Sequence, residues 1–103
     1  MLSNLKSQMR KGLLEYCILS IISRDEAYAS DILDIIKTSQ LLVVEGTLYP
    51  LLTRMKNEGL LSYRWQESTG GPPRKYYTLT PDGQQLLQQL HQEWQTISTA
   101  ISQ

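Results

Sequence analysis

Apolar positions in the first forty residues follow the period of two helices. Residues 5–23 carry a wide apolar stripe, which predicts a helix that is buried on more than one side. The stripe consists of Leu13, Leu14, Cys17, Ile18, Ile21 and Ile22. After a polar break at 24–26, residues 27–38 are expected to form a second helix, whose apolar face carries Tyr28, Ile32, Ile35 and Ile36.

A third helix is predicted after Val44. Four apolar residues spaced i, i+3, i+4, i+7 give it one buried face: Leu48, Leu51, Leu52 and Met55. Val44 cannot accept hydrogen bonds from the first N–H groups of a helix, and Pro50 is tolerated only near the first turn. We therefore expect the helix to begin close to Thr47, with Thr47 or Glu45 as its N-cap. Residues 39–44 fit either a short strand or a loop against the core.

The residues after this helix predict a β-hairpin and then a capped helix. Gly59 suits a left-handed helix end. Residues 60–67 and 75–79 are rich in Tyr and Trp and predict two strands around a Gly-Gly-Pro-Pro tip. Thr80-Pro81-Asp82 provides an N-cap, a first-position proline and an acidic first turn. Helix, hairpin and helix in this order predict a winged helix, a mainly α fold with a small β-hairpin.

The last helix, from Pro81 to about Ile101, carries an apolar seam with the 3, 4, 3, 4 spacing of a heptad. The seam consists of Leu87, Leu90, Trp94, Ile97 and Ile101. Leu2, Leu5 and Met9 form a narrow stripe at the other end of the chain. The seam fits core packing within one chain, but two unmatched stripes favour a two-fold dimer in which each covers the other.

Charge is concentrated where a DNA-facing surface would need it. The formal net charge is zero, but residues 54–75 carry five basic and two acidic residues, and no Lys or Arg follows Pro81. The outer face of the third helix and the base of the hairpin carry groups that bond to phosphate or base edges. These candidate DNA contacts are Thr47, Tyr49, Arg54, Lys56, Asn57, Arg74 and Lys75. The alternatives are a solvated face for the charged residues and packing against the first helix for Tyr49.

The motifs GTLYP and GGPPRKYY, joined by a short basic helix, NEGLL and a strand with Trp65, resemble the PadR-type transcriptional regulators of bacteria. The resemblance extends from Met9 to Ile101. It implies a homodimeric DNA-binding repressor whose last helix forms the dimer. Some similar proteins that bind drugs have a Trp at the place of Trp94, where paired indoles hold flat aromatic molecules. Trp94 is therefore expected either to pack in the interface or, with Cys17 and Ile18, to line a site for a small aromatic effector.

Several classes of function find no support in the residues. His91 and Cys17 are the only residues of their types, which excludes the usual zinc ligand sets and a disulfide within one chain. Gly70-Gly71 is followed by prolines rather than by the helix and lysine of a phosphate loop. We expect no enzymatic activity, no metal and no cofactor. Without a signal peptide or an apolar run long enough for a membrane span, a cytoplasmic protein is expected.

Together these patterns predict one compact unit with two roles. Residues 1–79 would form the winged-helix DNA-binding part with its N-terminal arm, and residues 80–103 would form the dimerisation helix. The expected function is sequence-specific repression at a palindromic operator by a homodimer, with release by a small aromatic ligand at the dimer interface. The alternatives are a winged helix that docks a protein without specific DNA binding, and a small-molecule sensor that binds DNA weakly.

Overall fold

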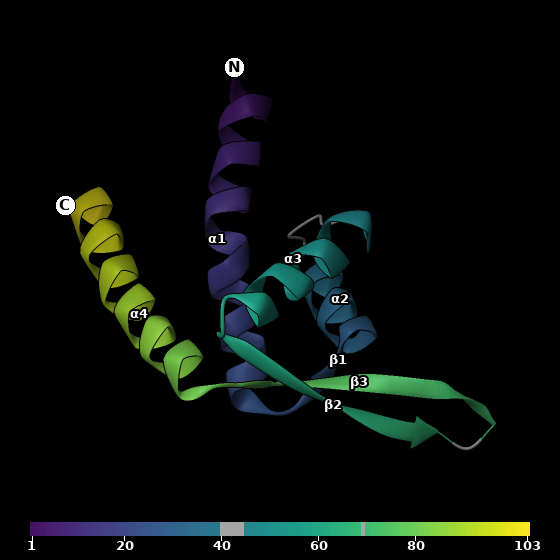
Figure 1. The fold of residues 1–103 in the computed structure, drawn as a ribbon. Coiled ribbons are helices and arrows are strands. Elements are labelled where there is room, and N and C mark those ends of the chain that lie inside the picture. Colours follow the sequence, from purple (N-terminus) through teal and green to yellow (C-terminus); the bar gives the residue numbers. More distant parts are fainter. Residues whose placement is uncertain (40–44, 69) are drawn as a thin grey trace.

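The computed structural model describes residues 1–39, 45–68 and 70–103, in which helices gather beside a small antiparallel sheet (Figure 1). The elements in chain order are α1 (Leu2–Arg24), β1 (Ala27–Tyr28), α2 (Ala29–Thr38), α3 (Glu45–Asn57), β2 (Leu61–Ser68), β3 (Gly71–Leu79) and α4 (Pro81–Ser102). β3 is the central strand of the sheet, in the order β1-β3-β2. The hairpin of β2 and β3, here called the wing, extends away from the helices. The predicted winged-helix fold is confirmed.

The core lies where α1, α2, α3 and the base of the wing meet. Its most deeply buried side chains, each less than 2% exposed or nearly so, are Ile18, Leu19, Ile32, Ile36, Leu48, Leu52, Met55 and Leu61. The predicted face of α3 is confirmed, with Leu51 only partly buried beside it. Fully burying one such side chain contributes about 1.5–3 kcal/mol. This core fixes the side of α3 that remains exposed.

The first residue of α3 differs from the prediction. The helix already includes Glu45, two residues before the expected start near Thr47. Pro50 consequently lies inside the helix, where it has no N–H to donate to the carbonyl of Gly46. The prediction was wrong because it assumed that the helix must begin within one turn of Pro50. The helix instead begins earlier and tolerates the missing N–H of Pro50 in its second turn. The alternatives for residues 40–44, and the cap position at Val44, lie outside the described residues.

Residues 27 and 28 form a strand rather than the first turn of a helix. Ala27 pairs with Tyr77 and Tyr28 pairs with Tyr76 in β3. Tyr28 has extended backbone angles, φ −72° and ψ 155°, and α2 begins after it. The expectation of a helix from residue 27 was wrong because these residues form a strand only by pairing with β3, about fifty residues later in the chain. Local hydrophobic periodicity contains no information about such a distant partner. Ile35, expected on the apolar face of α2, is 43% exposed, and Leu33 is buried instead.

The wing is longer than predicted on its second limb. β3 begins at Gly71 rather than at Lys75, so both prolines of the tip belong to the strand. The register between the strands shifts between Gln66 and Ser68, opposite these prolines. Prolines donate no N–H to a sheet and are found at edges and irregularities of this kind.

Two glycines and a threonine join the end of α3 to the start of α4. Gly59 has φ +82°, the left-handed conformation that ends α3. The hydroxyl of Thr80 donates to the carbonyl of Gly59 at 2.6 Å and accepts from the N–H of Gly83 at 3.0 Å. A Cβ on Gly83 would lie 2.1 Å from the carbonyl oxygen of Leu60. The predicted cap at Thr80 is confirmed, and the close approach of α4 to Leu60 requires glycine at position 83.

Candidate nucleic-acid interface

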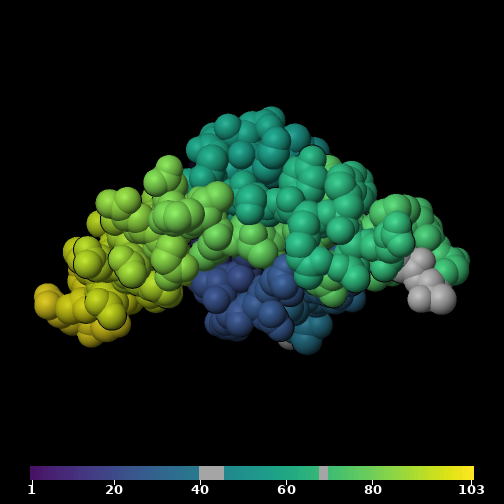
Figure 2. Space-filling view, turned by 60° about the horizontal axis from the view of Figure 1, so that its bottom comes forward, coloured from purple at the N-terminus to yellow at the C-terminus, as the bar shows by residue number. Residues whose placement is uncertain are grey.

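On one face of the molecule α3 lies next to the wing (Figure 2). The surface of α3 opposite the core is polar. Thr47, Thr53, Lys56 and Asn57 are exposed, and Tyr49 is 42% exposed. The helical phase inferred from the sequence is therefore confirmed for these side chains. Their hydroxyl, amide and ammonium groups are those that bond to phosphates and base edges.

A recess of about 100 Å³ lies between α3 and the wing. Its lining consists of Thr53, Lys56 and Asn57 from α3 and Tyr63, Lys75 and Tyr77 from the wing. The Nζ atoms of Lys56 and Lys75 lie 5.7 Å and 4.5 Å from the centre of the same Tyr63 ring. Two ammonium groups therefore stand at one opening, beside a hydroxyl and an amide. This combination of donors suits the oxygens of a phosphate group.

Two predicted DNA contacts on the wing lie on opposite faces of the sheet. Arg74 and Lys75 are neighbours in β3, and successive side chains in a strand alternate between faces. Lys75 faces the recess and also lies 5.3 Å from the ring of Trp65, which is 60% exposed. Arg74 lies on the other face, with its Cζ atom 4.9 Å from the ring centre of Tyr28.

Arg54, also predicted to contact DNA, is engaged within the chain. Its guanidinium forms an ion pair with Glu15 of α1 and lies 3.8 Å from Glu58 one turn later. The Arg54 side chain is still 55% exposed. Since ion pairs at such exposure contribute at most about 1 kcal/mol, they leave Arg54 able to exchange a carboxylate for a phosphate.

Arg64, counted among the basic residues of the wing, is held by a carboxylate. Its Nε and Nη2 atoms donate to Glu26 at 2.9 Å and 3.2 Å. These hydrogen bonds lower the pKa of the Glu26 carboxyl and raise that of Arg64. The charge of Arg64 is therefore balanced locally, unlike the charges of Lys56 and Lys75 at the recess.

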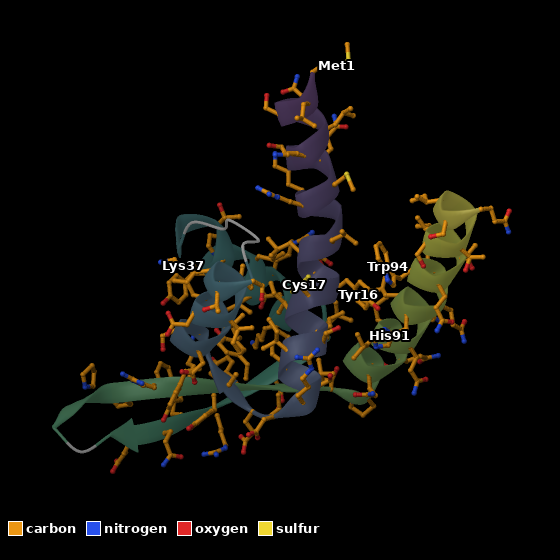
Figure 3. The ribbon with its side chains drawn as sticks, turned by 180° about the vertical axis from the view of Figure 1, so that it is seen from behind. Met1, Tyr16, Cys17, Lys37, His91 and Trp94 are labelled. Carbon is orange, nitrogen blue, oxygen red and sulfur yellow. The ribbon has the colours of Figure 1, made fainter. Side chains whose placement is uncertain are left out.

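The two terminal helices diverge (Figures 1 and 3). Their far ends expose large apolar side chains. Leu2, Leu5 and Met9 are 67%, 53% and 65% exposed on α1. Trp94, Ile97 and Ile101 are 43%, 43% and 75% exposed on α4. Leu87 is only 3% exposed, and Leu90 is half-buried. The seam predicted as a dimer interface is thus divided, since Leu87 belongs to the core of its own chain.

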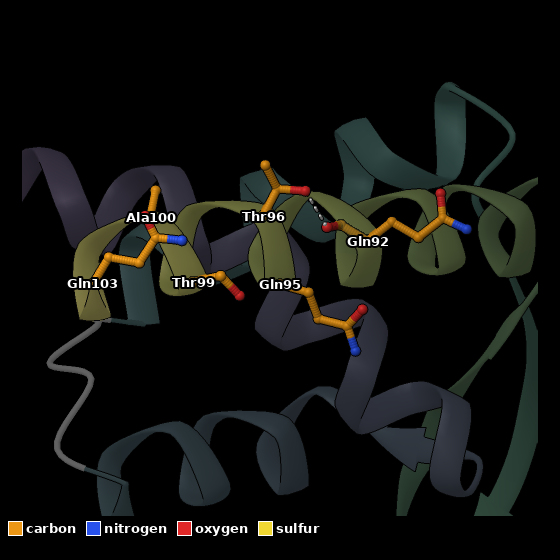
Figure 4. A pocket seen from close by; sticks show the side chains of 6 residues that line it. All are labelled: Gln92, Gln95, Thr96, Thr99, Ala100 and Gln103. Atoms are coloured by element: carbon orange, nitrogen blue, oxygen red, sulfur yellow. Dashed lines mark hydrogen bonds between the residues drawn. The ribbon is translucent and has the colours of Figure 1, made fainter.

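The opposite face of α4 is polar (Figure 4). It carries Gln92, Gln95, Thr96, Thr99, Ala100 and Gln103. The hydroxyl of Thr96 donates to the carbonyl of Gln92 at 3.1 Å. The end of α4 is therefore amphipathic, with one apolar side that no other described residue of the chain covers fully.

A second cavity, of about 330 Å³, lies between α1, α2 and the middle of α4. Cys17, Ile21 and Ile35 contribute to its lining together with Tyr16 and His91, which are joined by a hydrogen bond from α1 to α4. Figure 3 shows Tyr16, Cys17, His91 and Trp94 in this part of the molecule. Burial raises the pKa of the Cys17 thiol.

The three residues predicted to bind a small ligand do not all reach this cavity. Cys17 lines it, whereas Trp94 is not part of its lining. Ile18 is fully buried in the core, with 0% exposure, and does not line this cavity, so its part in a ligand site at the dimer interface stays a prediction. The stripe on α1 is wide enough that sequence periodicity cannot distinguish its core side from its cavity side.

The described residues provide no cluster of three or more His, Cys, Asp or Glu side chains suited to a metal ion. Within the same ranges, every helix is too short or too polar to cross a membrane.

Comparison with known proteins decides the family. Residues 18–89 match the transcriptional regulator PadR-like family. The chain belongs to the PadR-like family. It is 56% identical to a PadR-like transcription factor from Bacteroides fragilis, with a TM-score of 0.82 and 96% of each chain covered. It is 42% identical to a PadR-like transcriptional regulator from Bacillus cereus, also with a TM-score of 0.82, over 92% of this chain and 93% of that one.

Another PadR-like structure contains nucleic acid. PadR from Bacillus subtilis in complex with operator DNA is 28% identical to this chain, with a TM-score of 0.69. The match covers 76% of this chain and 46% of that protein. Membership of the PadR-like family makes the chain a transcriptional regulator rather than an enzyme, as the sequence led us to expect.

Several residues at the candidate interface were not predicted from the sequence. Tyr63 and Tyr77 line the recess, and Glu26 and Tyr28 hold the far face of the wing. Strand alternation places Tyr63 and Tyr77 on one face, which is a signal that the sequence contains. No local pattern connects Glu26 with Arg64, because the contact joins elements thirty-eight residues apart.

Proposed function

We propose that the protein binds operator DNA through α3 and the wing as a homodimer and represses transcription by occupying the operator. The recess between α3 and the wing carries this proposal. Lys56 and Asn57 come from α3 and Lys75 from the wing, so one phosphate group could be held by both elements at once. The complex of Bacillus subtilis PadR with operator DNA supports the same use of the fold.

The predicted contacts, together with Thr53 from the recess, divide into three groups in this arrangement. Thr47, Tyr49 and Thr53 would face the major groove along α3, while Lys56, Asn57 and Lys75 hold the backbone beside it. Arg74, on the far side of the wing, would reach the minor groove or a flanking phosphate. Arg54 would join the backbone contacts by exchanging Glu15 for a phosphate.

Dimerisation is proposed to cover the exposed ends of α1 and α4. The interface would consist of Leu5 and Met9 with Leu90, Trp94, Ile97 and Ile101. Leu87 would support it from within the core. Residues 1–79 then serve as the DNA-binding part and residues 80–103 as the dimerisation helix. Two-fold symmetry requires a palindromic site, with half-site centres about 34–36 Å apart when both copies read one face of the DNA.

A small aromatic effector is proposed as the signal that releases DNA. The cavity beside Cys17 is lined by α1, α2 and α4. A ligand there would therefore contact both the DNA-binding part, through α1 and α2, and the dimerisation helix α4. Trp94 would contribute from the dimer interface. A ligand shifts occupancy only by its difference in affinity between the two arrangements. A cytoplasmic location follows from the proposed work on DNA.

A mobility-shift titration with duplexes from upstream genomic regions tests the proposal. A shift at low salt that weakens steeply as salt rises is expected, because phosphate contacts release counterions. The absence of any shift at low salt would contradict it and favour a winged helix that docks a protein.

A further inference from the structure

Four side chains form a continuous stack on the face of the wing that is turned away from the recess. The Cζ atom of Arg74 lies 4.9 Å from the ring centre of Tyr28. The rings of Tyr28 and Tyr76 are stacked, with centres 3.8 Å apart and planes at 26°. The Cζ atom of Arg64 lies 4.9 Å from the ring centre of Tyr76. We call these four residues the cation–aromatic ladder.

The ladder connects the wing with β1, to which the backbone joins it through only two residue pairs. Arg74 and Tyr76 lie on β3 and Arg64 on β2, whereas Tyr28 lies where β1 meets α2. β1 contributes only two residues to the sheet. Arg74 lies two residues beyond the last β1 pair toward the tip of the wing. The ladder therefore extends the attachment of the wing past the end of the β1 pairing.

Arg64 and Tyr28 are each held by a carboxylate close to the start of α2. Residues 26–28 lead directly into α2, and Glu26 holds Arg64 through two hydrogen bonds. The N–H of Tyr28 donates to the carboxylate of Asp31 at 3.2 Å in the first turn of α2. Any tilt of the wing relative to α2 would separate Arg64 from Glu26 or open the Tyr28–Tyr76 stack.

The two arginines of the ladder are exposed and its two tyrosines are half-buried, so its contacts add little to the stability of the whole fold. Arg64 and Glu26 are 53% and 39% exposed, and exposed cation–aromatic contacts are individually weak. The wing extends into solvent and is joined to the helices at its base (Figure 1). Weak contacts placed along such an arm still reduce its range of angles, and a preorganised arm loses less conformational freedom on binding.

We propose that the cation–aromatic ladder sets the angle of the wing to α2 and α3, and that Tyr28, Arg64 and Glu26 are positioning residues for DNA binding that do not touch DNA. The inference rests on the proposed binding of DNA. Strand alternation puts Arg74 and Lys75 on opposite faces of the wing, and the contact with Tyr28 holds the Arg74 guanidinium in place on its own face.

Glu26→Gln gives the sharpest test, because the ladder and a simple release of Arg64 predict opposite changes in DNA affinity. Removing an acidic charge near DNA would strengthen binding if Arg64 were simply released to contact phosphate. The ladder predicts a loss of about threefold to tenfold in affinity, because Arg64 leaves its position on Tyr76. Asp34→Asn in α2 is the matched control, with the same change in charge and no part in the ladder. Its affinity should equal or slightly exceed that of the wild type.

The ring of Tyr28 is tested by a pair of variants. Tyr28→Leu should weaken binding about tenfold and lower the slope of log K against log salt concentration by about one, because Arg74 is no longer held in place. Tyr28→Phe keeps the ring and should bind within about twofold of the wild type. Equal losses in both variants, or no loss in Tyr28→Leu, would overturn the proposal.

A measurement without DNA separates this inference from the proposed function. Heteronuclear ¹⁵N NOE values of the Arg74 and Lys75 amides report the order of the wing in the free protein. They should fall in Glu26→Gln and Tyr28→Leu and stay at the wild-type level in Tyr28→Phe and Asp34→Asn. Unchanged values in the first two variants would refute the ladder. Failure of the wild type to bind DNA would refute only the proposed function, and the NOE values would still decide the ladder.

Discussion

Large apolar side chains are buried in the middle of the molecule and exposed at the free ends of its terminal helices. Leu48, Leu52 and Met55 on α3 are 0% exposed. Ile101 on α4 is 75% exposed, and Leu2 on α1 is 67% exposed. Both regions are amphipathic helices. The difference lies in whether the chain itself supplies a second surface to pack against.

The two terminal helices show this contrast within single elements. The second half of α1 is in the core through Ile18 and Ile22, whereas its first turns have no neighbour among the described residues. α4 is anchored at Leu87 and becomes increasingly exposed toward its end. A contiguous apolar surface of this kind usually marks an interface. The body of the protein packs within one chain, and the ends of α1 and α4 carry the apolar side chains that the proposed dimer would cover.

Truncating a core side chain should have the largest effect on the body. Leu52→Ala removes a fully buried side chain, so the free energy of unfolding should fall by about 2–5 kcal/mol in denaturant titrations. Ile35→Ala, at a position 43% exposed, is the control and should cost less than about 1 kcal/mol. Similar losses in both variants would contradict the contrast between core and surface.

Removing the Trp94 side chain from the exposed end of α4 should separate the two copies of the proposed dimer without unfolding either chain. Trp94→Ala is expected to raise the dimer dissociation constant about 30- to 1,000-fold, the usual cost of about 2–4 kcal/mol for a central interface aromatic. Sedimentation equilibrium measures the constant. Gln95→Ala, on the polar face of α4, should leave it unchanged. A wild-type protein that stays monomeric at all micromolar concentrations would exclude the dimer.

Removing a charge at the recess should weaken DNA binding with the wild-type fold retained. Lys56→Gln is expected to lower affinity about tenfold for all sequences and to reduce the salt slope by about one. Fluorescence anisotropy at several salt concentrations measures both. Lys6→Gln, on the exposed start of α1, is the matched control and should change the slope less. If both variants lose the same slope, binding is spread over the surface and the recess is not its centre.

Acid should loosen the far face of the wing through Glu26. The ordinary pKa of this carboxyl is 4.5, and hydrogen bonds from Arg64 lower the pKa in the folded chain. The contribution of the pair is therefore complete above 4.5 and is lost as pH falls through the lowered value. NOE values at Arg74 should keep their neutral-pH level down to about pH 4.5, fall as the pH is lowered further in the wild type, and stay flat in Glu26→Gln. A flat wild-type profile, with helical circular dichroism retained, would show that the pair does not order the wing.

The sequence was most informative where one local rule decides the structure. Helical spacing correctly identified the buried face of α3, and the cap at Thr80 correctly placed the start of α4. Pairings across the chain were not readable in this way. β1 exists because Tyr76 and Tyr77 lie beside it, and Leu87 is buried because α4 begins against Leu60.

The residues of the candidate interface show the same difference between local patterns and contacts across the chain. Helical phase alone brings Lys56 and Asn57 to one surface, and both were predicted. The position of Lys75 beside Lys56 depends on how the wing meets α3, and the pairing of Arg64 with Glu26 depends on the loop after α1. A count of basic residues could not distinguish the cation that is already paired from the two that face the recess.

Selection of bound duplexes from a random-sequence pool, at two salt concentrations and with sequencing of the bound fraction, tests the central claim most directly. The account predicts enrichment of a palindrome whose half-sites are about one helical turn apart, with less DNA retained at the higher salt concentration. Two chains should be present on each bound duplex. No enriched sequence at either salt concentration would contradict specific binding by a symmetric dimer.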